Sequence, residues 1–463
     1  MSKHSIRAVA GVAAFVVAAT TLAACSSPSE PASEATLDPN ADVTITVGNM
    51  PTSDNQANLD LFTEQVEQFE AAYPNVTVKG VETKFDPQTF SALVAGGSMP
   101  TTMIVPYTNI QQLAANGQVK DLTASIAADD DFAELVPEVQ AQTKDADGRS
   151  FGIVTAAYTM ALIYNRALYT EAGLDPDAPP TTWDEVAENA VKIAAASDAA
   201  GFTLSTTNNS GGWSLAAMTY AFGDELQEAD GDAVTATIDT PGAADALEFL
   251  QQVRWDEDAA GTNFLMSQDD LRTAIAAGQI GQTVLGADLY RDVVGNRKMP
   301  GDTLGIAPLP QTPDGIGTLG GGDVSIVSPK ASANETAAAL EWIKFRYLNR
   351  FVDEEAAVAY AEKSKAGGLP VGAPEVQLFG PAIYDQYLEW VAPFINVDRD
   401  HFTAYFDSLS SLKIVGEPRV AAQETYATLD AVVQQVLTSE DTDIAVALQD
   451  AQGAVQDIVD AAQ

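Results

Sequence analysis

The residue types that perform most enzyme chemistry are scarce in this 463-residue chain, with the exception of carboxylates. The chain has two histidines, His4 and His401, and one cysteine, Cys25. A Ser-His-Asp triad would therefore have to use His401, and cages of histidine or cysteine ligands are excluded, so we expect no metal and no cofactor. The 65 acidic residues could still supply the carboxylate pair of a glycoside hydrolase, which needs a separation of about 5–10 Å.

The overall charge excludes one class of partner. There are 23 basic and 65 acidic residues, which give a net charge of −42. Nucleic acid is not expected to bind, because its phosphates would be repelled. A solvated acidic surface is the simpler explanation of this charge, and a role connected with cations is the alternative. The length predicts about two to three domains.

The first 42 residues are predicted to target and tether the chain. Residues 1–24 have a basic start, an apolar stretch and small residues at the end, which is typical of a signal peptide. Leu22-Ala23-Ala24-Cys25 resembles the bacterial lipobox, which implies cleavage before Cys25 and a diacylglyceryl group on its sulfur. A plain secretory signal is the alternative. Residues 26–42 are rich in Ser, Pro and acids and should form a flexible linker after the lipidated cysteine. Two or more acyl chains would be a durable anchor.

Strand-like and helix-like segments alternate along the rest of the chain. Hydrophobic periodicity predicts strands at 43–50, 76–82, 102–106 and 152–163, with further strand and turn segments at 281–294 and 302–310. It predicts helices at 58–74, 87–95, 183–196, 335–348, 426–437 and 443–462. This alternation favours an α/β fold with largely parallel sheets.

Several segments, in order, resemble the family 1 extracellular solute-binding proteins, the capture subunits of ABC importers. The resemblance begins with FEAAYPNVTVKGVE and LVAGGSMPTTMIVPYTNIQQLAANGQVKDLT. It is most specific in ALIYNRALYTEAGLDPDAPPTTWDEV and continues in GGGDVSIVSPKASANETAAALEWIKFRYL. Thr101 departs from the acid that is common in the family at that position.

The resemblance implies two α/β lobes that are joined by a hinge and enclose a ligand cleft. Lobe 1 is expected to comprise residues 43–155 and 304–352, and lobe 2 residues 156–303 and 353–463. It also implies a monomer that binds a small solute, closes about the hinge, and delivers the solute to a permease at the extracytoplasmic face of the membrane. The membrane would be contacted through the lipid anchor only.

The resemblance also implies which residues line the cleft, because open α/β sheets bind ligands beyond the carboxyl ends of their strands. The candidates are Ser53, Asp54, Asn55, Thr108, Asn109, Tyr158, Asn208, Ser210, Trp213, Asp288, Gly321, Gly322 and Asp323. Asp54 and Asp288 could equally be turn residues. Asp288 stands where many relatives carry an aromatic residue, which suggests a smaller or more polar ligand than a long maltodextrin. His401, Phe402 and Tyr405 are weaker candidates for the rim, and Trp183 is expected to be structural.

Sugars offer CH faces and hydroxyl groups, so aromatic planes with amides and carboxylates point to a carbohydrate. A binding protein for a glycerophosphodiester, a peptide or a polyamine is the first alternative. The candidates include little basic charge, which argues against free phosphate, whereas Asp54, Asp288 and Asp323 keep a cationic ligand open. A lipid-anchored glycoside hydrolase is the less favoured alternative, and we expect no enzyme activity.

Overall fold

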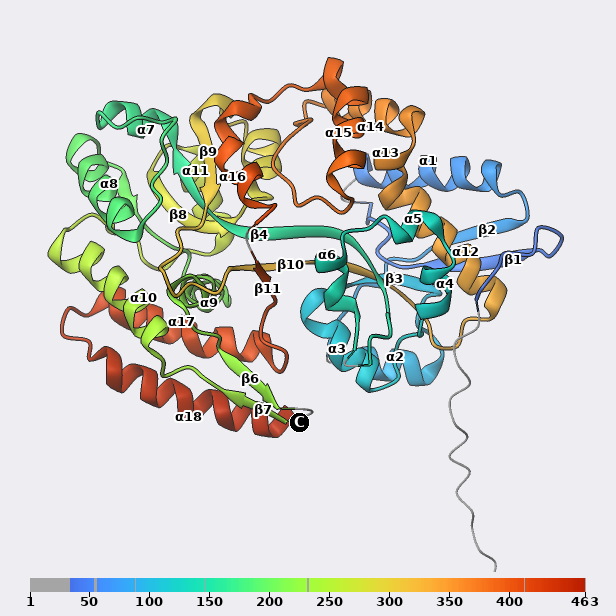
Figure 1. Cartoon of the computed structure of the whole chain (residues 1–463), viewed down its shortest axis with the longest axis horizontal. Coiled ribbons are helices and arrows are strands. Elements are labelled where there is room, and N and C mark those ends of the chain that lie inside the picture. The colour runs from blue at the N-terminus through green and yellow to red at the C-terminus, as the bar shows by residue number, and fades with distance from the viewer. Residues whose placement is uncertain are drawn as a thin grey trace, which may run out of the picture.

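Two long strands run through the middle of the molecule and belong to both of its lobes (Figure 1). The computed structural model describes residues 34–462 except 54, 55, 88, 146, 231, 232 and 412. In it, β4 (Ile153–Asn165) and β10 (Thr318–Val327) pair antiparallel from Ile153–Ser325 to Thr159–Gly320. The other edge of β10 pairs with lobe 1, and the C-terminal half of β4 pairs with lobe 2. These strands therefore carry the backbone from one lobe to the other.

Lobe 1 extends the sheet in the order β2-β1-β3-β10. Its strands are β1 (Val43–Val47), β2 (Val76–Gly80) and β3 (Thr102–Pro106). Its helices are α1 (Gln56–Ala72), α2 (Phe90–Gly96), α3 (Tyr107–Ala115), α4 (Thr123–Ala127), α5 (Asp130–Ala133), α6 (Pro137–Gln140), α12 (Ala333–Ile343), α13 (Asn349–Val352), α14 (Glu354–Ala366) and α15 (Pro381–Val391). Inward side chains of β1 alternate with exposed ones and meet the apolar face of α1 and the buried Trp342.

Lobe 2 continues the sheet through β4-β8-β5, with β9 also paired to β4. Its strands are β5 (Ala200–Phe202), β8 (Ile280–Gly286), β9 (Leu304–Pro308) and the separate hairpin of β6 (Gln227–Asp230) and β7 (Ala233–Ala236). Its helices are α7 (Arg166–Glu171), α8 (Trp183–Ala196), α9 (Ser210–Phe222), α10 (Pro241–Gln251), α11 (Gln268–Ala276), α16 (Thr403–Ser408), α17 (Ala422–Thr438) and α18 (Ile444–Ala462). The short β11 (Ile414–Val415) pairs with the start of β10.

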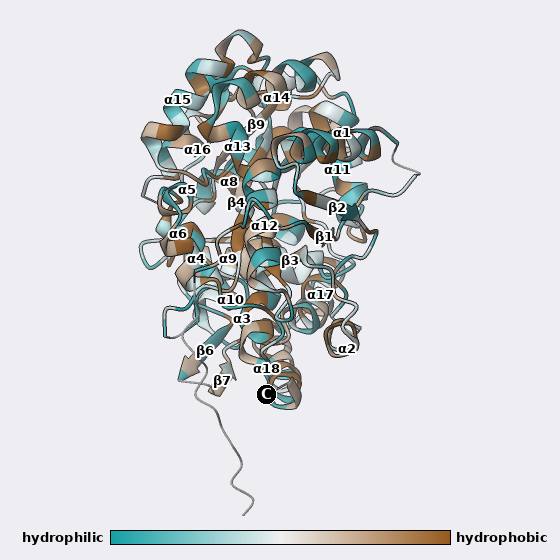
Figure 2. Ribbon diagram, turned by 90° about the vertical axis from the view of Figure 1, so that its right-hand side faces the viewer, coloured by the Kyte–Doolittle hydropathy of each residue, from teal (hydrophilic) through white to brown (hydrophobic). Residues whose placement is uncertain are grey.

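Helices cover the sheet in both lobes, and most of them carry polar and apolar faces (Figure 2). On α17, Leu429, Val432, Val433 and Val436 are buried, as the sequence predicts. Trp183 is also structural, as expected: it stacks on Phe222 at a centroid distance of 5.2 Å and lies within the lobe 2 core. None of the helices in the described part of the chain is long and apolar enough to cross a bilayer.

The predicted strands and helices form close to their expected positions, but the expectation of largely parallel sheets is wrong. Five pairings in the described structure are antiparallel: β10 with β3, β10 with β4, β4 with β8, β4 with β9, and β6 with β7 in the separate hairpin. The two crossing strands, β4 and β10, pair antiparallel because they run in opposite directions between the lobes. Parallel pairing is confined to β1 with β2 and β3, β5 with β8, and β10 with β11.

Packing also divides the chain differently from the expected boundaries. Residues 304–308, expected in lobe 1, form β9 and pair with residues 161–165 in the lobe 2 sheet. Residues 354–391, expected in lobe 2, supply α14 and α15, whose buried side chains join the lobe 1 core. The physical reason is that each apolar face packs against the nearest open sheet, which position along the chain does not reveal.

Candidate functional site

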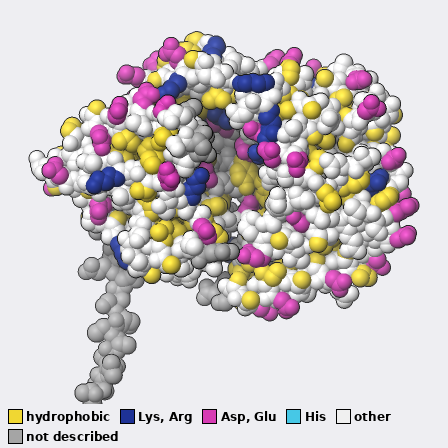
Figure 3. Space-filling model, turned by 180° about the vertical axis from the view of Figure 1, so that it is seen from behind, with side chains coloured by type: hydrophobic (Ala, Val, Ile, Leu, Met, Phe, Trp, Pro, Cys, Tyr) yellow, Lys and Arg dark blue, Asp and Glu magenta, His cyan; other side chains and the backbone are white. Residues whose placement is uncertain are grey.

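A cavity of about 600 Å³ lies between the lobes, beside the two crossing strands. Its volume is in the range typical of small-molecule sites. Figure 3 shows the hollow between the lobes, with acidic side chains spread over both and fewer basic ones. The wall is formed by Phe85, Pro87, Pro106, Tyr107, Thr108, Asn109, Ala156, Ala157, Tyr158, Asp288, Gly321, Gly322, Asp323, Glu417 and Gln423.

Two glycines of β10 make room for the aromatic side chains of this wall. A Cβ atom on Gly321 would lie 2.7 Å from Cζ of Tyr158, and one on Gly322 would lie 2.9 Å from Cε1 of Tyr107. Both distances are too short for a real side chain, so each ring rests directly on the backbone of β10. The sequence GGGD therefore places Asp323 immediately after two positions that admit aromatic rings.

The N-terminus of α9 positions Trp213 next to Tyr158. Asn209 has a left-handed φ of 69°, and its backbone N–H donates to a carboxylate oxygen of Asp430 at 2.8 Å. The other oxygen of Asp430 accepts from the N–H of Gly212 at 2.8 Å. These bonds hold the first turn of α9 against α17. As a result the rings of Trp213 and Tyr158 meet edge to face, with centroids 5.8 Å apart.

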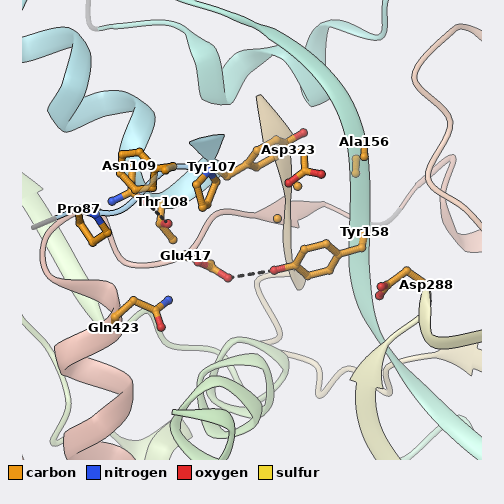
Figure 4. Close-up of a pocket in the computed structure, with 15 residues that line it drawn as sticks. Pro87, Tyr107, Thr108, Asn109, Ala156, Tyr158, Asp288, Asp323, Glu417 and Gln423 are labelled. Atoms are coloured by element: carbon orange, nitrogen blue, oxygen red, sulfur yellow. Dashed lines mark hydrogen bonds between the residues drawn. The ribbon is translucent and has the colours of Figure 1, made fainter. Parts of the chain in front are cut away.

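Glu417 is the polar centre of this region and follows β11 where the chain passes between the lobes. One of its carboxylate oxygens accepts hydrogen bonds from Oη of Tyr158 and from Nε1 of Trp213, both at 3.1 Å. Burial raises the pKa of Glu417 to about 7, and the two hydrogen bonds offset part of this rise because they stabilise the charged form. Figure 4 shows the bond between Glu417 and Tyr158.

Asp288 and Asp323 lie beside the Tyr158 ring on different sides from Glu417 (Figure 4). Both side chains are exposed to solvent inside the cleft. The surrounding protein nevertheless replaces part of their hydration, which raises both pKa values. Arg272 partly offsets the rise at Asp288, whereas the charge of Asp288 adds to the rise at Asp323. Neither carboxylate forms an ion pair with another residue in the described part of the chain.

Two smaller hollows continue the cavity. One of about 290 Å³ shares Tyr158, Asp288, Glu417 and Gln423 with it and adds Asn208, Asn209, Trp213, Gln268, Arg272 and Tyr426. The other, of about 400 Å³, shares Tyr107, Thr108 and Glu417 and adds Gln111, Ala141, Gln142, Lys144, Asp145, Pro418 and Arg419. Both hollows therefore adjoin the main cavity through shared wall residues.

The structure brings most of the predicted residues together. Thr108, Asn109, Tyr158, Asp288, Gly321, Gly322 and Asp323 line the main cavity, and Asn208 and Trp213 line the adjoining hollow. Ser210 does not join them: it is buried, and its hydroxyl donates to the carbonyl oxygen of Thr207 at 2.6 Å. Ser53 is exposed in a turn outside these hollows. Asp54, Asn55 and Cys25 lie outside the described residues.

The weaker rim candidates belong to the lobe 2 core. Phe402 and Tyr405 are at most 1% exposed, and the hydroxyl of Tyr405 is hydrogen-bonded to that of Thr159 at 2.8 Å. His401 lies 3.4 Å from Asp398 and does not line the cavity. Their aromatic side chains face inward because the segment closes the core beneath β8 and β9.

Glu417, Phe85, Gln423 and Arg272 were not predicted from the sequence. For Glu417 the sequence offered one signal: it is the only charged residue in the segment IVGEP. The other three had none, since a phenylalanine in a loop or a glutamine early in a helix is ordinary. Among the described residues, no three carboxylate or histidine side chains are close enough to hold one metal ion.

Comparison with known proteins assigns most of the sequence to one family. The bacterial extracellular solute-binding proteins match residues 53–349. A binding protein of Brucella abortus is 24% identical over 280 residues, which cover 60% of this chain and 66%, just under two thirds, of that relative. The sn-glycerol-3-phosphate-binding periplasmic protein of Yersinia enterocolitica is 37% identical over 73 residues, 16% of this chain and 17% of that protein.

Solved structures share the fold. The sugar-binding protein MalE of Xanthomonas citri superposes with a TM-score of 0.69 at 18% identity, over 90% of this chain and 98% of that one. The GacH receptor of Streptomyces glaucescens, solved free and with acarbose, gives 0.67 at 22% identity, over 91% and 100%. UgpB of Mycobacterium tuberculosis, solved with glycerophosphocholine, gives 0.68 at 18%, over 91% and 99%.

Proposed function

Because this chain belongs to the family of bacterial extracellular solute-binding proteins, we propose that it captures a carbohydrate for an ABC importer. One observation carries the choice of a carbohydrate. The cavity combines the aromatic side chains Phe85, Tyr107 and Tyr158 with short amides, a hydroxyl and three carboxylates. Aromatic planes suit the CH faces of a sugar ring, and carboxylates and amides accept hydrogen bonds from its hydroxyl groups.

We propose that the two lobes close about the crossing strands β4 and β10 when the solute binds. Asp323 and Tyr107 approach the cavity from lobe 1, Asp288 and Gln423 approach it from lobe 2, and Tyr158 lies on the crossing strand itself. A solute that contacts both walls binds a closed form better than an open one, and this difference in affinity drives closure. The closed form would then be recognised by the permease, with the chain acting as a monomer.

A lipid anchor completes the proposal. Cys25 would carry the acyl chains at the extracytoplasmic face of the membrane. The linker predicted at 26–42 is too long, because Ala35 and Asp38 hydrogen-bond to Ser125 and Asn334 of lobe 1 and Leu37 packs on its core. A Cys25→Ala protein should be released into the medium and still bind its ligand. Retention of that variant in the membrane fraction would contradict the anchor without affecting the carbohydrate proposal.

The ligand is tested by a thermal-shift screen of monosaccharides, oligosaccharides, polyols and glycerophosphodiesters, because bound ligand raises apparent stability. Calorimetry then measures affinity for the best ligand. Asp288→Ala and Trp213→Ala should each weaken binding at least tenfold. Asp245→Ala, on an exposed face of α10, is the matched control and should bind like the wild type. Wild-type affinity in both cleft variants would refute the assignment of the cleft.

A glycerophosphodiester is the second candidate, and Arg272 is the observation that favours it. The Nε atom of Arg272 is buried beside the adjoining hollow and has no hydrogen-bond partner among the described residues. A phosphate could accept from this guanidinium, and a glycerophosphocholine complex is known for a structural neighbour. The main cavity, however, is lined by three carboxylates and by no described Lys or Arg, which opposes an anion.

A glycoside hydrolase would turn over its substrate many times, whereas a binding protein would not. Incubation of the protein with the oligosaccharide that it binds should yield no product over many protein equivalents. Release of product in excess of the protein would show that the carboxylates of the cleft act as acid and nucleophile.

A further inference from the structure

The three carboxylates of the cleft differ from two other carboxylates of lobe 1, Glu375 and Asp129, in forming no ion pair with a basic side chain of the described residues. Glu375 contacts Arg291 and Arg350, and Asp129 contacts Lys344. By contrast, Asp288 and Asp323 form no ion pair in the described structure, and Glu417 accepts hydrogen bonds only from the neutral groups of Tyr158 and Trp213. The protein therefore surrounds this cavity with negative charge that its own side chains do not neutralise.

The basic side chains near the cleft do not change this balance. No described Lys or Arg lines the main cavity. Arg272 lines one adjoining hollow together with Asp288, and Lys144 and Arg419 line the other. The main cavity retains three acids. Like charges held together in a partly desolvated space attract a cation more strongly than a neutral hydroxyl group.

The spacing of the three acids favours an organic cation over a metal ion. The described residues include no group of three acidic or histidine side chains that could hold one metal ion. The carboxylates instead lie around the Tyr158 ring: Asp288 follows β8, Asp323 is on β10, and Glu417 follows β11 (Figure 4). Such a distribution suits an extended organic molecule, whose rings lie between the acids and whose charged group reaches one or two of them.

Tyr107 provides a second observation that points to a ligand. Its side chain lines the cavity and is only 8% exposed, yet its hydroxyl has no hydrogen-bond partner among the described residues. A phenolic oxygen can accept a hydrogen bond from an ammonium group, and the face of the ring attracts a cation. Asp323 lies close enough to affect Tyr107 electrostatically, so the two groups could act on the same part of a ligand.

We infer that the carbohydrate bound by this protein is an amino sugar, with a protonated amine held by Asp323 and Asp288 beside the aromatic wall. This inference rests on the proposed function, since it specifies the sugar that the same cleft would bind. The sugar ring would pack against Tyr158 and Trp213, and its remaining hydroxyls would donate to Glu417. A neutral sugar could occupy the same space, but it would leave the two aspartates without a counter-ion.

The test compares sugars that share one skeleton. Calorimetry on the full chain would use cellobiose, the disaccharide of two glucosamine units, N,N′-diacetylchitobiose, and trehalose with its 2-amino analogue. Spermidine and glycerophosphocholine serve as non-sugar probes. We expect an amine-bearing sugar to bind at least tenfold more tightly than its hydroxyl and acetamido counterparts, and this preference should decline as salt is added.

Asp323→Asn provides the second measurement, because it keeps the shape of the side chain and removes its charge. It should reduce the preference for the amine from tenfold or more to below threefold, whereas Asp245→Asn should leave the preference unchanged. Circular dichroism and the unfolding midpoint would verify that both variants fold.

The outcomes separate the two proposals. If the tightest-binding sugar is neutral, or if Asp323→Asn keeps the full preference for the amine, the amino-sugar inference is wrong and carbohydrate capture stands. If spermidine or glycerophosphocholine binds and no sugar does, the carbohydrate function is refuted and the inference falls with it. Absence of binding by every sugar has the same consequence.

Discussion

Two groups of charges lie where the lobes meet, and they are built in opposite ways. In the first, which we call the interlobe cluster, Arg291 from lobe 2 donates to Oη of Tyr360 at 2.9 Å and approaches Glu375 to 3.4 Å. Arg350 approaches the same carboxylate oxygen to 3.2 Å and lies over the Tyr360 ring. In the second, the carboxylates of the cleft form no ion pair within the described residues, and Arg272 only partly offsets the pKa rise of Asp288.

The contrast separates structural charges from charges available to a ligand. Burial alone would raise the pKa of Tyr360, but Arg350 and Arg291 outweigh it and lower that pKa. The pKa values of Asp288 and Asp323 are instead raised by burial, with too little opposing charge. Opposite charges thus stabilise the interlobe cluster within the protein, whereas the charges of the cleft cost stability until a partner arrives.

The largest expected effect comes from breaking the interlobe cluster. Glu375→Ala would leave two partly buried guanidinium groups facing each other without a counter-ion. We expect a loss of about 3 kcal/mol in the free energy of unfolding, measured by urea denaturation without ligand. The exposed pair of Glu64 and Lys363 is the matched control, and Glu64→Ala should cost less than about 1 kcal/mol. Equal losses in the two variants would contradict the comparison.

A smaller, pH-dependent effect is expected at Glu417. The folded-state pKa is raised to about 7 from 4.5, so between these values the folded protein holds a proton that the unfolded chain releases. The contribution of this group to stability is therefore lost as pH rises from about 4.5 to 7 and is constant above. The full shift corresponds to about 3 kcal/mol. Because Glu417 is only half-buried, we expect the wild type to lose about 2 kcal/mol across this window relative to Glu417→Gln.

Urea denaturation of both proteins at several pH values measures this difference. The groups that face Glu417 are Tyr158 and Trp213, with Tyr220 and Tyr426 nearby. Glu424→Gln, on an exposed part of α17, is the control and should show no such dependence. A parallel pair of pH profiles for the wild type and Glu417→Gln would refute the raised pKa.

Trp213→Phe should have a milder effect, because it keeps an aromatic ring and removes the indole N–H together with the five-membered ring. Glu417 would lose one of the two hydrogen bonds that stabilise its charged form. We expect a loss of about 1 kcal/mol at pH 8 and a shift of the Glu417 transition to higher pH. An unchanged transition midpoint would show that this hydrogen bond does not persist in solution.

The smallest effect on stability is expected from the double variant Asp288→Asn with Asp323→Asn. Because both pKa values are raised in the fold, removing these charges at pH 8 should not destabilise the protein. Its free energy of unfolding should lie within about 0.5 kcal/mol of the wild-type value, with any change toward a gain. A loss as large as that of Glu375→Ala would make the aspartates structural and would remove the distinction between the two regions.

Local pattern was sufficient to predict much of the fold. The strand at 102–106 and the helix at 183–196 form as predicted, because their hydrophobic periodicity and flanking residues act within a few positions. Tyr158, Asp288 and Asp323 were also predicted to lie together, through resemblance to a family rather than through spacing. Ser210 was misplaced because a serine before a helix can bond either to a ligand or to its own backbone, and here it bonds to Thr207.

The sequence by itself determined the elements and the scarcity of catalytic side chains, because these depend on short-range order and composition. Its resemblance to a known family added the expectation of two lobes. Only the tertiary structure decided that Glu417 meets Tyr158 and Trp213, which are 259 and 204 positions away. It also decided that Arg291 and Arg350 share Glu375, while the cleft has no such partner for Asp288 or Asp323. Charge neutralisation depends on distances of a few ångströms, and those distances exist only once the crossing strands have brought the two lobes together.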